Sequence, residues 1–335
     1  MFMKVYSSDK IRNIVLLGHG GVGKTTVAEA MAFASGAITR RGSVNDGNTI
    51  SDFDAEETKR HFSVNTSILP IEWEEYKINI LDTPGYFDFV GEVEEALRAA
   101  EGAVIVVSAK SGVQVGTELA WEKAEAAGLP RFIFVNGMDE EGANLVKVLE
   151  DLQSTFGKAI APFQVPIKEN GKFVGFVNVV KMEGRKFEGD RVVPCEIPDS
   201  MADEIDPVRQ MILEAVAETD EELMERYFDG DEFTVDEIQD ALKSGIVSGD
   251  IVPVLCGCAI NGTGIGVLMT SICRYFPVAE MVHPTLDAVD KDGKPVKVEC
   301  GETAPFSAFV FKTSVDPFLG KITYFKINSG ILRRD

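Results

Sequence analysis

The sequence predicts an α/β protein with a doubly wound, mainly parallel sheet, an α+β insertion and the start of a β-barrel. Three observations predict this. Short apolar runs alternate with helix-like segments through the first half of the chain. That alternation breaks after about residue 157 and resumes near residue 251, and from residue 305 apolar and polar residues alternate as in exposed strands. The predicted parts are therefore 9–157 and 251–285 for the sheet domain, 158–250 for the insertion and 290–335 for the barrel.

The sheet domain is predicted from five apolar runs, which suit strands that are covered on both faces. These runs span residues 14–17, 78–81, 103–107, 132–135 and 252–255. Amphipathic helices are predicted after Gly23 and over residues 92–100, 117–127 and 144–156, and Gly128 and Pro130 end the third of them. Strands that alternate with helices form βαβ units, so the sheet is expected to be parallel.

The insertion is predicted to contain short strands over residues 163–168, 173–180 and 186–193, with turns at Asn170-Gly171 and Glu188-Gly189. Helices follow near residues 202–219, 220–227 and 234–243. Thr234 precedes Glu237 by three residues, which is the spacing of a capping box. Two further strands, 307–312 and 321–328, begin the predicted barrel. The sequence ends before the barrel could close, so a fragment of a longer protein is expected.

Composition limits the function. The chain of 335 residues is long enough for two or three domains and contains no run of 18 apolar residues, and residues 1–13 lack the long apolar stretch typical of a secretory leader. No membrane association and a cytoplasmic location are therefore expected. The net charge of −21 disfavours general attraction to nucleic acid, so any RNA contact would be local. The five cysteines show no C-x-x-C spacing and the three histidines are scattered, which argues against a zinc site.

Acidic residues gather in the insertion, where residues 196–240 hold seventeen Asp or Glu against Arg209 and Arg226 alone. Such a run forms either a solvated helical surface or a docking face for a basic partner. The sequence by itself leaves both interpretations open.

A phosphate-binding motif, G-x-x-x-x-G-K-T, follows the first predicted strand and precedes a helix, which is the context that the mechanism needs. Glycines let backbone N–H groups face a phosphate, Lys24 bridges phosphates and the Thr25 hydroxyl suits Mg²⁺. A chance match is the alternative, and the strand–loop–helix context disfavours it. The predicted phosphate-binding residues are Gly18, His19, Gly20, Gly21, Val22, Gly23, Lys24, Thr25 and Thr26.

A second motif, Asp82-Thr83-Pro84-Gly85, follows the strand at 78–81. Asp82 stands at a strand end, where its carboxylate could support Mg²⁺ without binding the ion directly. The Gly85 N–H can donate to a γ-phosphate. The alternative is a plain turn. Its position after a phosphate loop favours a nucleotide-sensing switch.

Guanine recognition is predicted from Asn136 and Asp139, which end the strand at 132–135 as N-x-x-D with Gly137 where N-K-x-D has lysine. The Asp139 carboxylate can accept from guanine N1–H and N2–H₂, which adenine cannot present in that arrangement. Without the lysine, affinity is expected to fall while specificity survives. After the last strand, Cys258 and Ala259 follow, and a backbone N–H near Ala259 is expected to donate to guanine O6.

In the order of its motifs the chain resembles the translational GTPases, and elongation factor G in particular, over essentially its whole length. The similar stretches include residues 18–25, 82–85, 112–114, 142–144, 221–224 and 316–321. The resemblance implies that GTP, GDP and Mg²⁺ bind and that the chain is a monomer. It also implies that the partner is the ribosome, through ribosomal RNA and through the large-subunit stalk protein at the acidic insertion. A complete factor of this kind moves transfer RNA and messenger RNA through the ribosome.

Four departures from that family matter. The family's catalytic histidine falls on Tyr86, which leaves Gly85 and Tyr86 as the candidate catalytic positions and predicts slow hydrolysis. The Mg²⁺-binding threonine falls on Ser63, which keeps a hydroxyl. The family's phosphate-loop aspartate, which is implicated in binding a monovalent cation, falls on Gly21, so a potassium requirement is not implied. The fourth departure is Gly137, described above. The combination resembles a divergent second copy of elongation factor G, and His19 and His61 are not expected to replace the missing histidine.

Three functions compete at this stage. The leading hypothesis is a GTPase that binds the ribosome with GTP and relaxes after hydrolysis. A GTP-dependent ribosome-binding or ribosome-protection module with little hydrolysis is the main alternative, and Tyr86 favours it. A protection protein of the tetracycline-resistance type is disfavoured, because residues 221–227 and 316–321 are more similar to elongation factor G.

Overall fold

A seven-stranded sheet forms the centre of the molecule, and all five apolar runs lie in it as predicted. The computed structural model describes residues 4–188, 191–316 and 318–333. Every neighbouring pair in the sheet is parallel except β2 and β3, and the order is β2-β3-β1-β4-β5-β11-β6. The strands are β1 Ile11–Leu17, β2 Ser67–Trp73, β3 Tyr76–Asp82, β4 Gly102–Ser108, β5 Arg131–Asn136, β6 Ile160–Pro162 and β11 Val252–Gly257.

The two strands that the sequence did not predict are the edges of this sheet. β2 alternates between buried and exposed residues and carries an exposed proline, Pro70, which an edge strand tolerates. β6 has three residues, too few to give a pattern. Because β6 pairs with β11, the predicted insertion boundary at residue 158 falls just before a strand of the main sheet.

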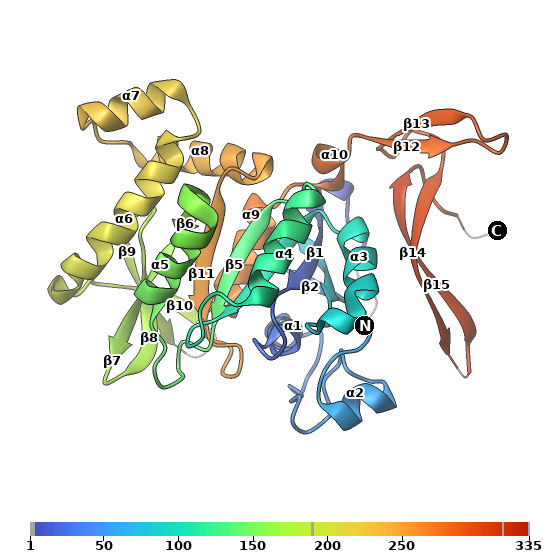
Figure 1. Ribbon diagram of the computed structural model, residues 1–335, viewed down its shortest axis with the longest axis horizontal. Helices are drawn as coiled ribbons and strands as arrows, with labels where there is room; N and C mark the ends of the chain where they lie inside the picture. Colours follow the sequence, from blue (N-terminus) through green and yellow to red (C-terminus); the bar gives the residue numbers. More distant parts are fainter. Residues whose placement is uncertain (1–3, 189–190, 317, 334–335) are drawn as a thin grey trace.

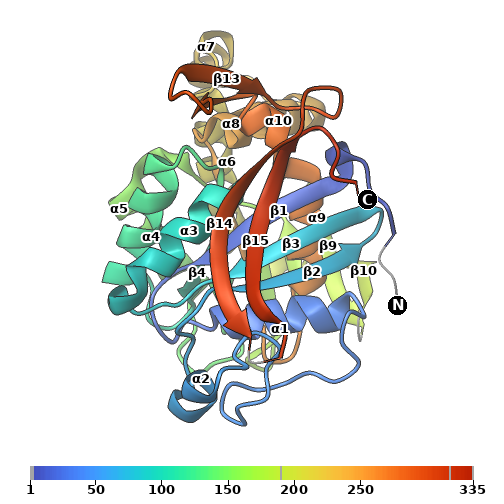
Figure 2. The same cartoon turned by 90° about the vertical axis from the view of Figure 1, so that its right-hand side faces the viewer.

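Helices cover the sheet, and the four helical regions predicted in the first half of the chain are confirmed. They are α1 Lys24–Ala34, α3 Val90–Ala99, α4 Val115–Ala126 and α5 Leu145–Phe156. The helices α2 Ala55–Arg60, α9 Ile265–Tyr275 and α10 Ala279–Val282 were not predicted, nor were the short 3-10 turns Ser8–Lys10, Phe87–Phe89, Gly157–Ala159 and Asp199–Met201. Figure 2 shows α3, α4 and α5 gathered on one side of the sheet, while α9 packs with α1.

The insertion forms a separate antiparallel sheet with helices beside it, at the left of Figure 1. Its strands are β7 Gln164–Glu169, β8 Lys172–Asn178, β9 Glu183–Glu188 and β10 Arg191–Cys195, in the order β10-β9-β8-β7. The prediction of one strand over residues 186–193 was wrong. The run doubles back, so that Val192 lies opposite Phe187, and Gly189 of the predicted turn lies outside the described residues.

The helices of the insertion are α6 Ala202–Ala217, α7 Glu221–Asp229 and α8 Val235–Ser248, close to their predicted spans. Thr234 and Glu237 form the predicted capping box at the start of α8. Of the helices in the described part of the chain, none is both long and apolar enough to cross a bilayer.

The C-terminal region is built of two hairpins, at the right of Figure 1. One joins β12 Thr285–Val289 to β13 Pro295–Glu299, and the other joins β14 Ser307–Asp316 to β15 Gly320–Ser329. The two predicted strands are confirmed in β14 and β15. Pro317, within the family-like stretch at 316–321, lies outside the described residues. The barrel that these strands would begin stays a prediction.

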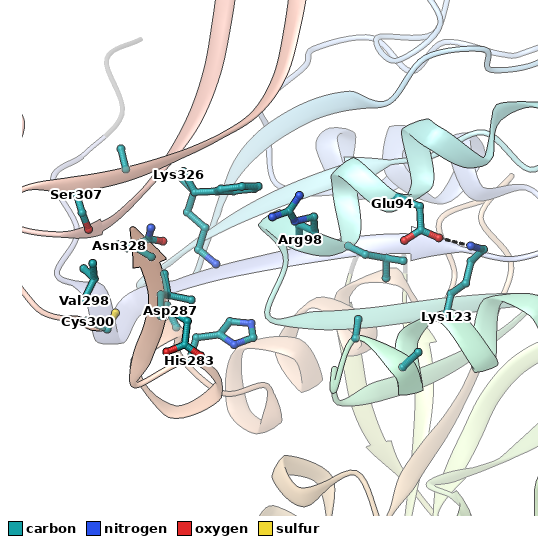
Figure 3. Close-up of a pocket in the computed structure, with 18 of the residues that line it drawn as sticks. Glu94, Arg98, Lys123, His283, Asp287, Val298, Cys300, Ser307, Lys326 and Asn328 are labelled. Atoms are coloured by element: carbon teal, nitrogen blue, oxygen red, sulfur yellow. Dashed lines mark hydrogen bonds and ion pairs between the residues drawn. The ribbon is translucent and has the colours of Figure 1, made fainter. Parts of the chain in front are cut away.

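Two ion pairs fasten the long hairpin to the sheet domain. Lys312 of β14 pairs with Glu92 of α3, and Lys326 of β15 pairs with Glu101. Burial lowers the pKa of Lys326 to about 8. Arg98 also lies 4.4 Å from the ring centre of Phe309, within range of a cation–π contact. Figure 3 shows Lys326 and Arg98 facing a cavity of about 790 Å³ between the hairpins and helices α3 and α4.

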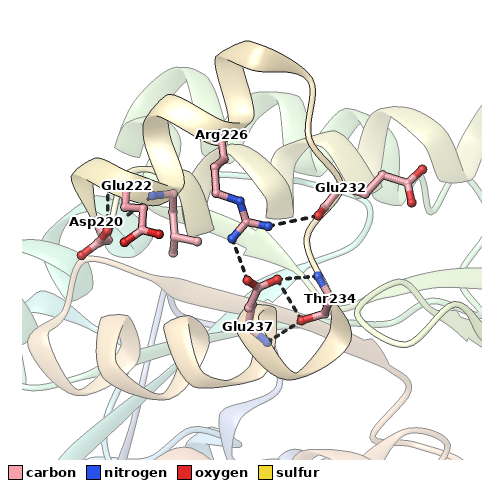
Figure 4. Close-up of polar contacts among 7 residues, drawn as sticks. Asp220, Glu222, Arg226, Glu232, Thr234 and Glu237 are labelled. Atoms are coloured by element: carbon pink, nitrogen blue, oxygen red, sulfur yellow. Dashed lines mark hydrogen bonds and ion pairs between the residues drawn. The ribbon is translucent and has the colours of Figure 1, made fainter.

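A charged contact joins α7 to α8 in the insertion (Figure 4). Arg226 donates to the Glu237 carboxylate at 2.6 Å, and the amide and hydroxyl of Thr234 donate to it at 2.8 Å. These donors favour the ionised form of Glu237, so its pKa falls from the usual 4.5 to about 2, with Arg226 the largest cause.

This contact predicts a local dependence on pH. A carboxyl whose pKa is lower in the folded than in the unfolded state contributes its full stabilisation above the unfolded pKa. For Glu237, that stabilisation is lost as pH falls from about 4.5 towards about 2. The protection factors of the α7 and α8 amides, which correct hydrogen exchange for its intrinsic pH dependence, should therefore fall over that range in the native sequence. Glu237→Gln should remove this dependence, whereas Lys243→Ala, which breaks an exposed ion pair with Asp240 on α8, should leave it. The same acid response in Glu237→Gln would contradict the assignment.

Candidate nucleotide site

The loop between β1 and α1 approaches its neighbours closely enough to need glycine. Gly18 has φ +136°, and a Cβ there would lie 2.4 Å from the backbone oxygen of Val106. Only glycine adopts this conformation without strain. The loop therefore turns sharply at the end of β1 and directs its later residues towards the start of α1, where helix N–H groups are free to bind an anion.

The Lys24 side chain lies inside this loop. Its Nζ donates to the backbone oxygens of Gly18 and His19, both at 3.0 Å. Burial lowers the pKa of Lys24 to about 8, and the charges of Asp82 and Asp52 oppose that shift. A Cβ on Gly85 would lie 2.4 Å from this Nζ, so the predicted switch loop and the phosphate loop are in direct contact at the ammonium.

An oxygen-rich cluster lies beside Lys24. The hydroxyls of Thr25 and Ser63 are 3.0 Å apart, so the predicted metal ligands from two distant segments are brought together. The carboxylates of Asp82 and Asp52 are buried, and no oxygen of either has a hydrogen-bond partner within 3.5 Å in good geometry among the described residues. Such a set of oxygens fits Mg²⁺, which takes hydroxyl, water and carboxylate oxygen.

The titration of Asp82 reflects its surroundings. Burial raises its pKa to about 6, Asp52 adds to that shift, and the nearby Ser51 and Thr25 hydroxyls oppose it. Burial also raises the pKa of Asp52. Two like charges in one dry pocket repel each other, and a cation between or beside them would relieve this cost.

The segment that carries Ser63 is held by two buried glutamates that the sequence did not single out. Glu29 of α1 accepts from the amides of Gly42 at 2.6 Å and Ile50 at 2.8 Å. Glu57 of α2 accepts from the amides of Val64 and Asn65, both at 2.9 Å. The only local signal was the D-x-x-E spacing of Asp54 and Glu57, which form a capping box. Glu29 thus ties the segment to α1, and Glu57 fixes the turn after α2 that carries Ser63.

Tyr86 lies over the phosphate loop rather than away from it. Its ring centre is 4.6 Å from that of Phe62, and a Cβ on Gly20 would touch its ring at 3.4 Å. The side chain is 48% exposed. His19 and His61 are engaged elsewhere: the Nδ1 of His19 accepts from the Gly116 amide at 3.3 Å, and that of His61 lies 3.0 Å from the Val44 oxygen.

The guanine-site residues are linked to one another. The Asn136 amide nitrogen donates to the Val22 oxygen at 3.0 Å, and its oxygen accepts from the Ala259 amide at 2.9 Å. The expected donor to guanine O6 is thus bound to Asn136 in this structure. Asn136 holds the phosphate loop against the loop after β11, which is a positioning role that the motif alone did not reveal.

Asp139 and Gly137 complete this end of the site. Asp139 is exposed, whereas the Cys258 thiol is buried, and burial is the main reason that the pKa of this thiol rises to about 12. Gly137 has φ +83°, where a side chain would be strained and a Cβ would come 2.6 Å from the Glu140 carboxylate. The absence of lysine at this position therefore matches the backbone conformation.

A cavity of about 560 Å³ is lined by the phosphate loop, residues 41–45, residues 61–63, the Gly85-Tyr86 loop and Ile260.

The chain is matched by the family described as "Elongation factor Tu GTP binding domain" over residues 9–278. The chain belongs to this family. It therefore carries a guanine-nucleotide-binding GTPase domain of the translational type.

One solved structure is similar to nearly the whole of this chain. The chain is similar to a protein from Thermus thermophilus whose crystal structure is known, with a TM-score of 0.83 and 36% sequence identity. The match covers 96% of this chain and 46% of that one, so this chain spans about half the length of that protein.

The anchoring role of Glu29 gives a prediction. Glu29→Ala leaves the amides of Gly42 and Ile50 without their acceptor and should lower the free energy of unfolding by about 1–3 kcal/mol. Limited proteolysis should then cut faster within residues 40–65. Glu56→Ala is the matched control, because Glu56 is exposed and only pairs with Arg60 on the surface. Equal proteolysis of the two variants would refute the anchoring role.

Proposed function

We propose that this chain binds GTP and GDP with Mg²⁺ and hydrolyses GTP slowly, as part of a factor resembling elongation factor G. That factor would work on the ribosome in the cytoplasm, as a monomer, during translocation or a related step. The observation that carries the proposal is the grouping of the buried Lys24 ammonium, the Thr25–Ser63 hydroxyl pair and two buried carboxylates beside one cavity.

The phosphates would lie on the loop from Gly18 to Thr26. Its backbone N–H groups and the N-terminus of α1 would bind phosphate oxygens, and Lys24 would exchange its two backbone acceptors for them. The Gly85 N–H would meet the γ-phosphate, since Gly85 lies against Lys24. Release of that phosphate after hydrolysis would then free the Gly85-Tyr86 loop.

Thr25 and Ser63 would hold Mg²⁺, with Asp82 supporting it from further away. When bound, the ion neutralises charge on the phosphate oxygens. Ser63 reaches Thr25 because Glu29 and Glu57 hold its segment in place. The same hydroxyl contact would therefore report whether that segment is closed.

The base would be recognised by Asp139, whose exposed carboxylate is free to accept from guanine N1–H and N2–H₂. Asn136 fixes the positions of Val22 and Ala259 next to the base site through its two hydrogen bonds. No side chain at Gly137 covers the base, which supports a weaker affinity than the full motif provides.

Hydrolysis transfers the γ-phosphoryl group to water and yields GDP and phosphate. Tyr86 is close enough to the phosphate loop to contact that water, but a phenol lacks the basic nitrogen with which an imidazole polarises it. Slow turnover follows. The packing of Tyr86 on Phe62 favours the second candidate function, a GTP-dependent ribosome-binding or ribosome-protection module with little hydrolysis.

The acidic insertion would bind the stalk protein of the large subunit, and a local surface would contact ribosomal RNA. α7 is the best-placed docking element, because the structure gives it no buried residue and leaves Glu221, Glu222 and Glu225 exposed. α6 is less suited to docking, because Ile205, Val208 and Ile212 on it are buried in the core.

Calorimetric titration with GTP, GDP and ATP in Mg²⁺ tests nucleotide binding. Guanine nucleotides should bind and ATP should not, because Asp139 faces a hydrogen-bond donor pair only in guanine. Hydrolysis is then measured with and without ribosomes. Equal affinity for ATP would overturn the role of Asp139, and binding without turnover would favour the second candidate function.

Tyr86→His should raise the rate of GTP hydrolysis at least about tenfold while leaving GTP affinity nearly unchanged, since general acid–base groups contribute about 10²–10⁴-fold when well placed. Single-turnover hydrolysis on ribosomes measures it. Phe87→His, one residue further along the same loop, is the matched control and should not raise the rate. If neither variant is faster, the low rate does not come from Tyr86.

Replacing Glu221, Glu222 and Glu225 of α7 by Gln should weaken binding to the stalk protein, measured by titration with the purified partner. The control replaces an equal number of exposed acids on α4 and α5, namely Glu118, Glu122 and Glu150. A specific docking face requires that only the α7 variant lose affinity. Equal losses would indicate a general charge effect instead.

A further inference from the structure

Arg41 lines the nucleotide cavity together with Lys24, and the nucleotide-binding motifs do not include it. We infer that its guanidinium binds the α-phosphate of the nucleotide. This inference rests on the proposed function and adds a contact to the same site. Arg41 comes from the segment between α1 and α2, so the assignment would make that segment part of the binding site.

The charge of the cavity points to this role. Among the described residues that line it, Lys24 and Arg41 are the basic side chains other than the His61 imidazole. Lys24 lies inside the phosphate loop, whereas Arg41 lies beside Ile260, next to the guanine-site residue Ala259. The part of a bound nucleotide between those two ends is the ribose with the α-phosphate, and only the phosphate is an anion.

The guanidinium is fixed in place with donor capacity to spare. One terminal nitrogen donates to the Ile260 oxygen, and the other lies 3.1 Å from where a Cβ on Gly262 would stand. The group also lies 5.6 Å from the ring centre of Phe33. Its Nε is buried and has no hydrogen-bond partner in the described part of the chain. A planar donor fork of this kind matches the oxygens of a phosphate.

The backbone next to Arg41 is held as well. The amide of Gly42 donates to the buried Glu29 at 2.6 Å, so the segment is tied to α1, the helix that follows the phosphate loop. Because the segment is already anchored, less conformational entropy would be lost when a nucleotide binds. A purely structural role, in which Arg41 only fastens the Ile260 loop, is the competing explanation.

Titration of the full chain with GTP and with GDP separates these explanations. Arg41→Ala should weaken both nucleotides by about the same factor, on the order of tenfold, because both carry the α-phosphate. The dependence of affinity on salt should become shallower, since a charge contact is lost. Arg41→Lys should recover part of the affinity. Arg40→Ala is the matched control, because Arg40 is exposed and does not line the cavity.

Unchanged affinities in Arg41→Ala, with normal binding by the native chain, would overturn this assignment alone. A loss of preference for GTP over ATP with an unaltered salt dependence would also overturn it, because that pattern means a loosened guanine loop. If the native chain bound no guanine nucleotide, the proposed function would fail and the assignment with it.

Discussion

The burial of the Lys24 ammonium is the constraint on which the site depends. A cation removed from water needs compensating charge and hydrogen-bond acceptors, which two loop carbonyls and the carboxylates of Asp82 and Asp52 supply. These groups meet because β1 and β3 are adjacent and parallel, so their carboxyl ends reach the same edge of the sheet. The pairing of two apolar strands therefore decides where the charges lie.

Much of the fold could be predicted because its signals are local. Apolar runs identified the five inner strands, and the cap of α8 was readable from Thr234 and Glu237. The edge strands β2 and β6 were missed, since a half-exposed strand and a three-residue strand give little pattern. In the site, Ser63, Gly85 and Asn136 each contact the phosphate loop. Glu29 and Arg41 could not be found, because their importance comes from contacts with residues distant in sequence.

Two departures from the family pattern, Gly137 and Tyr86, fit the local structure around them. Gly137 stands where the backbone adopts a positive φ, so glycine relieves the strain that a longer side chain would bring. Tyr86 packs on Phe62 and over Gly20, where a Cβ would lie in contact with its ring at 3.4 Å. The phenol therefore has neighbours in both the Ser63 segment and the phosphate loop.

The junction at Glu92 has a mechanical consequence. Its carboxylate pairs with Lys312 and also accepts from the Thr66 amide at 2.6 Å, so α3, β14 and the end of the Ser63 segment share one group. Lys312 stands four residues before Asp316, the last residue of β14, so the arm of the hairpin beyond this junction is about 13 Å long. A rotation of about 10° about the junction would move the end of that arm by about 2 Å. A displacement of the Ser63 segment would therefore be passed to the far end of the hairpin through one carboxylate.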